Sequence, residues 1–109
     1  MVVLSAGQKQ YTVFVPVETL QQQEAARRLK SVLLTELSGV TDIPAQGYWN
    51  PPNGVTLGEV GRAYVLIVTD EQEQFVRYCV EDYAEFSGEQ QVLMTRNNVD
   101  VFYFNKEKQ

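Results

Sequence analysis

The sequence contains no histidine and a single cysteine, Cys79. Without an imidazole, histidine-activated nucleophiles, proton shuttles and histidine-containing zinc sites are all excluded. One cysteine cannot form an intramolecular disulfide, which is typical of a protein from a reducing compartment. Because Cys79 falls on the apolar face of a predicted helix, we expect a buried structural thiol rather than a nucleophile.

Basic residues and long apolar runs are also scarce. The 109 residues include 9 Lys and Arg against 14 Asp and Glu, a formal net charge of -5. We therefore expect no binding to nucleic acid or to an anionic membrane surface. No apolar run approaches the roughly 20 residues that cross a bilayer. Residues 1–10 lack the basic and apolar regions of a secretion signal, so we expect a cytoplasmic location.

The length predicts one domain, residues 1–109, with flexible segments at residues 1–9 and 105–109. Hydrophobic periodicity predicts three strands and two helices, followed by a β-rich region. The predicted strands are residues 11–17, 45–50 and 55–69, the helices are residues 20–37 and 70–87, and the β-rich region is residues 91–104. This last region fits either a second hairpin or one long bulged strand, and a bulge is also expected at Gly58 or Gly61.

Both predicted helices have recognisable ends. Thr19 and Gln22 have the spacing of a capping box, and Asp70 and Glu73 have the same spacing at the second helix. Gly39 and Gly88 follow the two apolar stripes, where glycine commonly ends a helix.

The element order predicts an α+β fold, the ferredoxin-like βαββαβ plait, with an additional C-terminal strand and both helices on one face of an antiparallel sheet. The first and third strands would be central and the second would lie at an edge, in agreement with the prolines that flank it, Pro44, Pro51 and Pro52. The other face of the sheet would be apolar and uncovered. We therefore expect a homo-oligomer, a dimer or trimer, formed through sheet faces or edges.

The segment QGYWNPPNGVTLGEVG, residues 46–61, is the candidate site. Its Asn53-Gly54 pair predicts a two-residue type I′ turn. That turn would place Trp49 opposite Gly58, where the indole could cover the bare backbone.

The same turn would make Tyr48 and Glu59 cross-strand neighbours. An aromatic wall beside a carboxylate suits a small polar or cationic ligand, although packing and turn chemistry alone would also account for these residues. We expect no catalytic residue, no metal site and no cofactor. The predicted ligand-binding residues are Tyr48, Trp49, Glu59 and Arg62.

The element order in a small acidic chain resembles the PII-like signalling proteins over about residues 10–104. This resemblance implies an oligomeric plait whose loop between the second and third strands contacts partners, with effectors bound in clefts between subunits. The segment SGEQQVLMTRNN, residues 87–98, does not match the nucleotide loop of PII proteins, so no nucleotide-binding residue is carried over. The GYWNPPNG hairpin with its following Gly-Glu is also similar to uncharacterised plait families with a Gly-Tyr-Trp strand.

These features predict a non-enzymatic, homo-oligomeric protein of PII-like architecture that binds a small ligand or a partner protein in a regulatory role. The alternative is a small cofactor-independent enzyme of the dimeric plait type, monooxygenase- or isomerase-like, with its pocket on the sheet face. The lack of histidine counts against this alternative. A purely structural assembly subunit is the third possibility.

Overall fold

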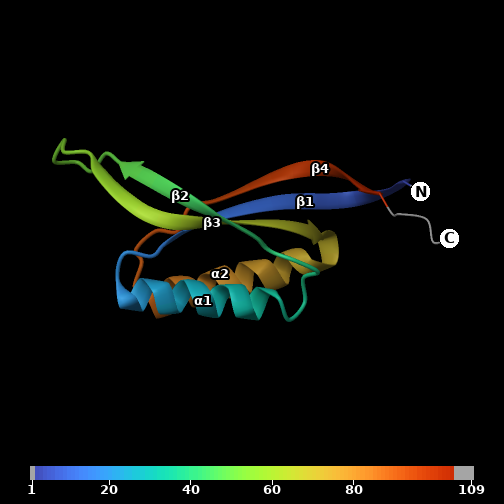
Figure 1. Cartoon of the computed structure of the whole chain (residues 1–109), viewed down its shortest axis with the longest axis horizontal. Coiled ribbons are helices and arrows are strands. Elements are labelled where there is room, and N and C mark those ends of the chain that lie inside the picture. Colours follow the sequence, from blue (N-terminus) through green and yellow to red (C-terminus); the bar gives the residue numbers. More distant parts are fainter. Residues whose placement is uncertain (1, 105–109) are drawn as a thin grey trace.

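The computed structural model describes residues 2–104, which form a four-stranded antiparallel sheet with two helices on one face (Figure 1). The elements are β1 (Val2–Pro16), α1 (Leu20–Leu33), β2 (Thr41–Trp49), β3 (Leu57–Thr69), the 3-10 turn η1 (Asp70–Gln72), α2 (Glu73–Ser87) and β4 (Met94–Phe104). The strand order is β2-β3-β1-β4, so β1 and β3 are central and β2 lies at an edge. The predicted α+β ferredoxin-like plait is confirmed.

The core lies between the helices and the sheet face that they cover. Strands contribute every second residue to this face, and helices contribute one stripe, because side chains alternate along strands and recur every three to four residues along helices. The strand residues of the core are Tyr11, Val13, Val15, Tyr64, Leu66 and Val68, and the helical ones include Leu29, Leu33, Val76, Cys79 and Tyr83.

Both prolines within strands lie where their missing N–H is tolerated. Pro44 is in β2, whose outer edge has no neighbouring strand among residues 2–104. Pro16 pairs with Gly61 of β3 on one side, while on the other side β4 reaches only as far as Met94, opposite Val13. Neither proline therefore interrupts a ladder between two strands.

Residues 94–104 form the single strand β4, so the expected additional C-terminal strand is absent from the part of the chain that the structure describes. Asn97 and Asn98, which could have formed a turn, instead pair with Gln10 and Lys9 of β1. The long pairing with β1 occupies the backbone groups of β4 along its length, which favours the extended form over a hairpin.

Residues 2–9, which the sequence predicts to be flexible, form the first part of β1 and pair with the C-terminal half of β4. The ladder shifts by one residue between Ser5 and Gln8, which places a bulge in β1. The pairing of β3 is continuous on both sides, so the bulge predicted at Gly58 or Gly61 is wrong. Residues 1 and 105–109, predicted to be flexible, lie outside the described residues.

The helix α1 begins where predicted and ends earlier. Gln22 N–H donates to Thr19 Oγ1 and Thr19 N–H donates to Gln22 Oε1, both at 3.0 Å, which confirms the capping box. The helix ends at Leu33 with Leu34 as its C-cap, so Gly39 is not the cap. After Leu33, the N–H groups of Thr35 and Glu36 each donate to the carbonyl three residues earlier, a common way of ending a helix.

The turn before α2 is capped one residue earlier than predicted. Gln72 Oε1 accepts a 3.1 Å hydrogen bond from the N–H of Thr69, so Thr69 rather than Asp70 occupies the N-cap position. Gln72, reaching back to Thr69, takes the role predicted for Glu73, whose side chain is left for other contacts. Gly88 ends α2 with a φ of 75°, as predicted.

The described chain is elongated, with principal extents of 59 × 26 × 25 Å. The β2–β3 hairpin projects past the helices at one end, and the paired start of β1 and end of β4 project at the other (Figure 1). Each projection is a two-stranded ribbon, which is marginally stable in water without further packing. No helix among residues 2–104 has the length and apolar character needed to cross a membrane.

Candidate functional site

A turn at residues 51–54 replaces the predicted Asn53-Gly54 turn. The N–H of Gly54 donates a 3.0 Å hydrogen bond to the carbonyl of Pro51. Gly54 has a φ of 81°, whereas no residue other than glycine in the described chain has a positive φ. A type I′ turn needs positive φ at both central positions, so this prediction is wrong. Pro52, at the second position of the turn, has a fixed φ near -65° that favours the geometry found.

The longer connection shifts the register of the hairpin by one residue. Trp49 is opposite Leu57 and Tyr48 is opposite Gly58. Since neighbouring residues point to opposite faces, the shift changes which side chains meet. A Cβ added at Gly58 would lie 3.4 Å from the Tyr48 ring, so Tyr48 rather than Trp49 covers this glycine. Tyr48 and Glu59 lie on opposite faces, and the predicted pairing between them is wrong.

Trp49 and Glu59 nevertheless meet as diagonal neighbours on one face of the hairpin. The indole Nε1–H of Trp49 donates to Glu59 Oε1 at 3.2 Å. Burial raises the pKa of Glu59, the Trp49 hydrogen bond opposes this rise, and the carboxylates of Glu89 and Glu18 add to it. Glu59 is therefore a carboxylate in negative surroundings, held in place by an aromatic side chain.

An open hollow of about 660 Å³ lies beside this pair, between the hairpin and the connection from α2 to β4. Glu89, in that connection, accepts a 3.0 Å hydrogen bond from Gln22 Nε2 of α1. The hollow therefore combines an indole, two carboxylates and side-chain amides. Its lining residues are Trp49, Leu57, Glu59, Gly88, Glu89, Gln90 and Gln91.

Arg62, the fourth predicted site residue, is engaged elsewhere. Its Nε donates to Asp42 Oδ1 at 2.7 Å, while Lys30 Nζ lies 2.9 Å from Asp42 Oδ2. Burial alone would raise the pKa of Asp42, but the hydrogen bonds from Lys30 and Arg62 hold it below its ordinary value. These ion pairs join α1 to β2 and β3. The structure thus brings Trp49 and Glu59 together and places Arg62 in a separate cluster.

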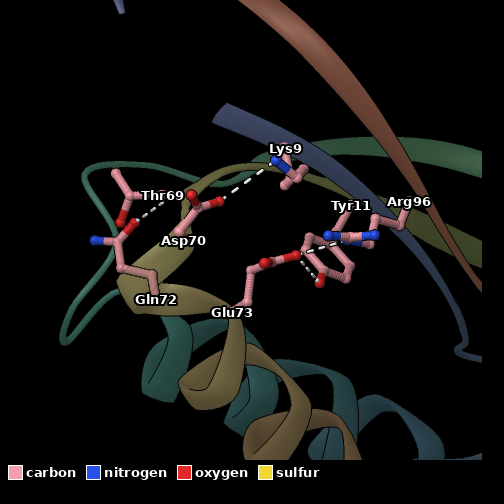
Figure 2. A network of polar contacts seen from close by, with 7 residues as sticks. All are labelled: Lys9, Tyr11, Thr69, Asp70, Gln72, Glu73 and Arg96. Carbon is pink, nitrogen blue, oxygen red and sulfur yellow. Dashed lines mark hydrogen bonds and ion pairs between the residues drawn. The ribbon is translucent and has the colours of Figure 1, made fainter. Parts of the chain in front are cut away.

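A second polar cluster, shown in Figure 2, was missed by the sequence reasoning. Glu73 Oε1, in the first turn of α2, accepts 2.6 Å hydrogen bonds from Tyr11 Oη and Arg96 Nε. Lys9 Nζ lies 3.4 Å from Asp70 Oδ1 nearby. Tyr11 and Arg96 are paired residues of β1 and β4, so the cluster is visible only once the register of these strands is known.

Two other kinds of chemistry have little support. Among residues 2–104, no group of three or more histidine, cysteine, aspartate or glutamate side chains is placed to hold a metal ion. Cys79 is buried as expected, and burial raises the pKa of its thiol, which disfavours the nucleophilic thiolate. What the hollow offers is an aromatic surface with hydrogen-bond acceptors.

Neither a protein-family model nor a curated protein matches the sequence. Solved structures do match the fold. The periplasmic divalent cation tolerance protein CutA from Archaeoglobus fulgidus has a TM-score of 0.66 and 15% identity, covering 84% of this chain and 83% of that one. A DUF3240 family protein from Shewanella baltica has a TM-score of 0.62 and 8% identity, covering 96% and 100%. A phage SAM lyase in complex with S-methyl-5′-thioadenosine has a TM-score of 0.64 and 10% identity, covering 96% and 95%.

At these identities the likeness concerns the fold alone. The shared fold is the ferredoxin-like plait, which agrees in architecture with the predicted resemblance to PII-like proteins.

Proposed function

We propose that this protein is a non-enzymatic, homo-oligomeric protein of PII-like architecture that binds a small ligand in a regulatory role. The observation that carries the proposal is the Trp49–Glu59 hydrogen bond at the edge of the 660 Å³ hollow. The volume is within the range of small-molecule sites, about 300–1,000 Å³. Trp49 supplies a flat apolar surface and Glu59 a fixed acceptor, the two elements that orient a small ligand.

The apolar residues left uncovered on the sheet support the homo-oligomer. Ile43 on β2 and Tyr103 on β4 remain 45% and 47% exposed, and Leu93, directly before β4, remains 53% exposed. Within residues 2–104 the two projecting ribbons also have free outer edges, and natural proteins rarely leave such edges unprotected. A second copy packed on these surfaces would cover both features and would narrow the open side of the hollow.

The proposed location is the cytoplasm, which the single cysteine supports. The acidic balance supports the proposed absence of nucleic acid and membrane among the partners. The CutA protein from Archaeoglobus fulgidus is described as periplasmic. Fractionation of cells that express the natural gene tests the location directly, and recovery of the protein outside the cytoplasm contradicts it.

The enzyme alternative has less support from the chain itself. The phage SAM lyase indicates that this fold can carry an enzyme. The hollow on the uncovered sheet face, of about 290 Å³, is lined by Val65, Ile67 and Tyr103 among others, and Tyr103 is the one titratable side chain among its lining residues that the structure describes. A proton-transfer mechanism in this hollow would have Tyr103 as its one acid–base group among the described lining residues.

Ligand binding is tested by a thermal-shift screen of nucleotides, organic acids, amines and S-adenosylmethionine. Because Trp49 is the only tryptophan of the chain, its emission reports on the hollow. We expect a ligand that raises the melting temperature, changes the Trp49 emission and binds Glu59→Gln more weakly. The control is Glu81→Gln on the exposed side of α2, which changes the net charge equally. A stabilising ligand that leaves the emission unchanged and binds Glu59→Gln normally places the site elsewhere.

A further inference from the structure

The charges around the hollow select a class of ligand. Glu59 on β3 and Glu89 on the α2–β4 connection face it from two sides, and every other lining residue is uncharged. Glu18 and Glu89 both act on Glu59 as negative charges. A hollow with this lining attracts cations and repels carboxylate or phosphate ligands.

The arrangement of the two carboxylates favours an organic cation over a metal ion. Glu59 uses Oε1 to accept from Trp49, and Glu89 uses Oε1 to accept from Gln22. Each carboxylate therefore keeps Oε2 as an acceptor. A metal ion needs several oxygens at one point, and no group of three acidic residues within residues 2–104 provides them. An extended ligand can instead reach the two carboxylates separately.

Trp49 and Leu57 provide a surface for the apolar part of such a ligand. Trp49 is 38% exposed and Leu57 is 54% exposed, and both line the hollow. An aliphatic chain that connects two ammonium groups would lie against them. An ammonium near the indole face also gains a cation–π attraction.

Tyr83 places a buried hydroxyl near these acids, although it does not line the hollow. Its side chain is 2% exposed, and its hydroxyl forms no well-aligned hydrogen bond among the described residues. Burial raises the pKa of Tyr83 and the carboxylates of Glu89 and Glu59 raise it further, while a weak hydrogen bond with the Ser87 side chain lowers it. The two acids of the hollow therefore act on the same buried hydroxyl.

We infer that the hollow binds a short aliphatic diamine, with one ammonium group on Glu59, the other on Glu89, and the methylene chain against Trp49. This inference rests on the proposed function and adds the chemical class of the ligand.

Three four-carbon probes of equal length test the inference on the full chain. They are 1,4-diaminobutane, 1,4-butanediol and succinate, which differ in charge. Isothermal titration calorimetry and Trp49 emission are expected to show binding of the diamine and at least about tenfold weaker binding of the other two. Raising the salt concentration should weaken the binding of the diamine. Absence of diamine binding, or equal binding of the diol, overturns the inference.

The outcome also separates this inference from the proposed function. If succinate or another uncharged or anionic compound binds and changes the Trp49 emission, the site stands and the diamine is the wrong class. If no compound of the wider screen changes this emission, the proposed function fails as well.

Matched variants locate the contacts. Glu59→Gln and Glu89→Gln should each lower the affinity for the diamine about tenfold or more, whereas Glu81→Gln should leave this affinity unchanged. Tyr83→Phe removes no charge and its hydroxyl does not line the hollow, so it should leave the affinity for the diamine unchanged. The three probes on the natural chain keep the test available if a glutamine variant fails to fold. An equal loss in Glu81→Gln, or no loss in Glu89→Gln, overturns the inference.

Discussion

The hydroxyl of Tyr11 donates a 2.6 Å hydrogen bond to Glu73 Oε1, which joins the middle of β1 to the first turn of α2 (Figure 2). Arg96 of β4 donates to the same oxygen at 2.6 Å. These hydrogen bonds, that of Arg96 first, hold the pKa of Glu73 below its ordinary value. One carboxylate thus connects two strands of the sheet to a helix that covers it.

Glu73→Gln should destabilise the protein at neutral pH by about 1.5–3 kcal/mol, the usual contribution of hydrogen bonds to a charged group. Because the pKa of Glu73 is lowered in the folded protein, its contribution is present above the unfolded value of 4.5 and is lost as the pH falls through the folded value. The difference between variant and natural protein should therefore shrink from pH 7 to pH 3. Urea unfolding at a series of pH values measures it.

The control for this prediction is Glu71→Gln, which removes an exposed carboxylate two residues away in η1. It should change the free energy of unfolding by less than about 0.5 kcal/mol. A loss in Glu73→Gln that stays the same at pH 3 contradicts the account, because it would then come from packing rather than from charge.

Glu59→Gln, unlike Glu73→Gln, should not destabilise the protein at neutral pH. The pKa of Glu59 is raised by burial and by Glu89 and Glu18, so its ionised form is disfavoured in the folded protein. Its favourable contribution is present below the unfolded value of 4.5 and is lost as the pH rises through the folded value. The variant should melt at an equal or higher temperature than the natural protein at pH 7, with the gain disappearing by pH 4. A lower melting temperature at pH 7 contradicts this sign.

Two buried tyrosines should respond differently to loss of the hydroxyl. Tyr64 Oη donates a 3.0 Å hydrogen bond to the carbonyl of Ala26, and burial raises its pKa to about 12. Tyr83 Oη has no such partner among the described residues. Tyr64→Phe should lose about 1 kcal/mol in urea unfolding, and Tyr83→Phe should lose nothing or gain slightly. Equal losses in both variants would mean that the Tyr83 hydroxyl has a partner after all.

How far the sequence predicts this molecule depends on how local each signal is. The capping box of Thr19 and Gln22 and the terminal Gly88 involve neighbouring residues only, and both were predicted correctly. The hairpin was wrong by one residue because Pro52 competes with the Asn53-Gly54 pattern and closes a different turn. This shift of one residue in the register places Tyr48 and Glu59 on opposite faces of the hairpin.

Features that depend on distant partners were the ones missed. The first half of β1 has a weak strand pattern and is ordered by pairing with β4, far along the chain. Glu73 has the spacing of a capping residue, and only the register that places Tyr11 beside Arg96 reveals its actual contacts. Register between distant strands is set by packing of the whole sheet, which periodicity within one segment does not contain.

Gly61→Ala should be among the most damaging single substitutions. A Cβ at this position would lie 2.6 Å from the carbonyl oxygen of Val15 and 2.6 Å from the ring of Phe14. The backbone of β1 has to move to relieve the first contact, so we expect a loss of about 1–3 kcal/mol or more. Gly39→Ala is the matched control, since a Cβ there meets nothing within 4 Å. Urea unfolding should find Gly39→Ala neutral or slightly stabilising, and similar losses for both would remove the steric argument.

The oligomer is tested by light scattering coupled to size exclusion. Ile43 lies on β2 in register with Ala63, on the sheet face away from the helices, and is 45% exposed. Ile43→Lys places a charge on that face and should shift the proposed dimer or trimer towards the monomer, because burying an unpaired ammonium is unfavourable. Tyr78→Lys is the control, since Tyr78 is 63% exposed on α2, on the helical side. It should leave the mass unchanged. If the natural protein is a monomer at high concentration, or if Tyr78→Lys dissociates it as much as Ile43→Lys does, the uncovered sheet face is not the surface through which the copies associate.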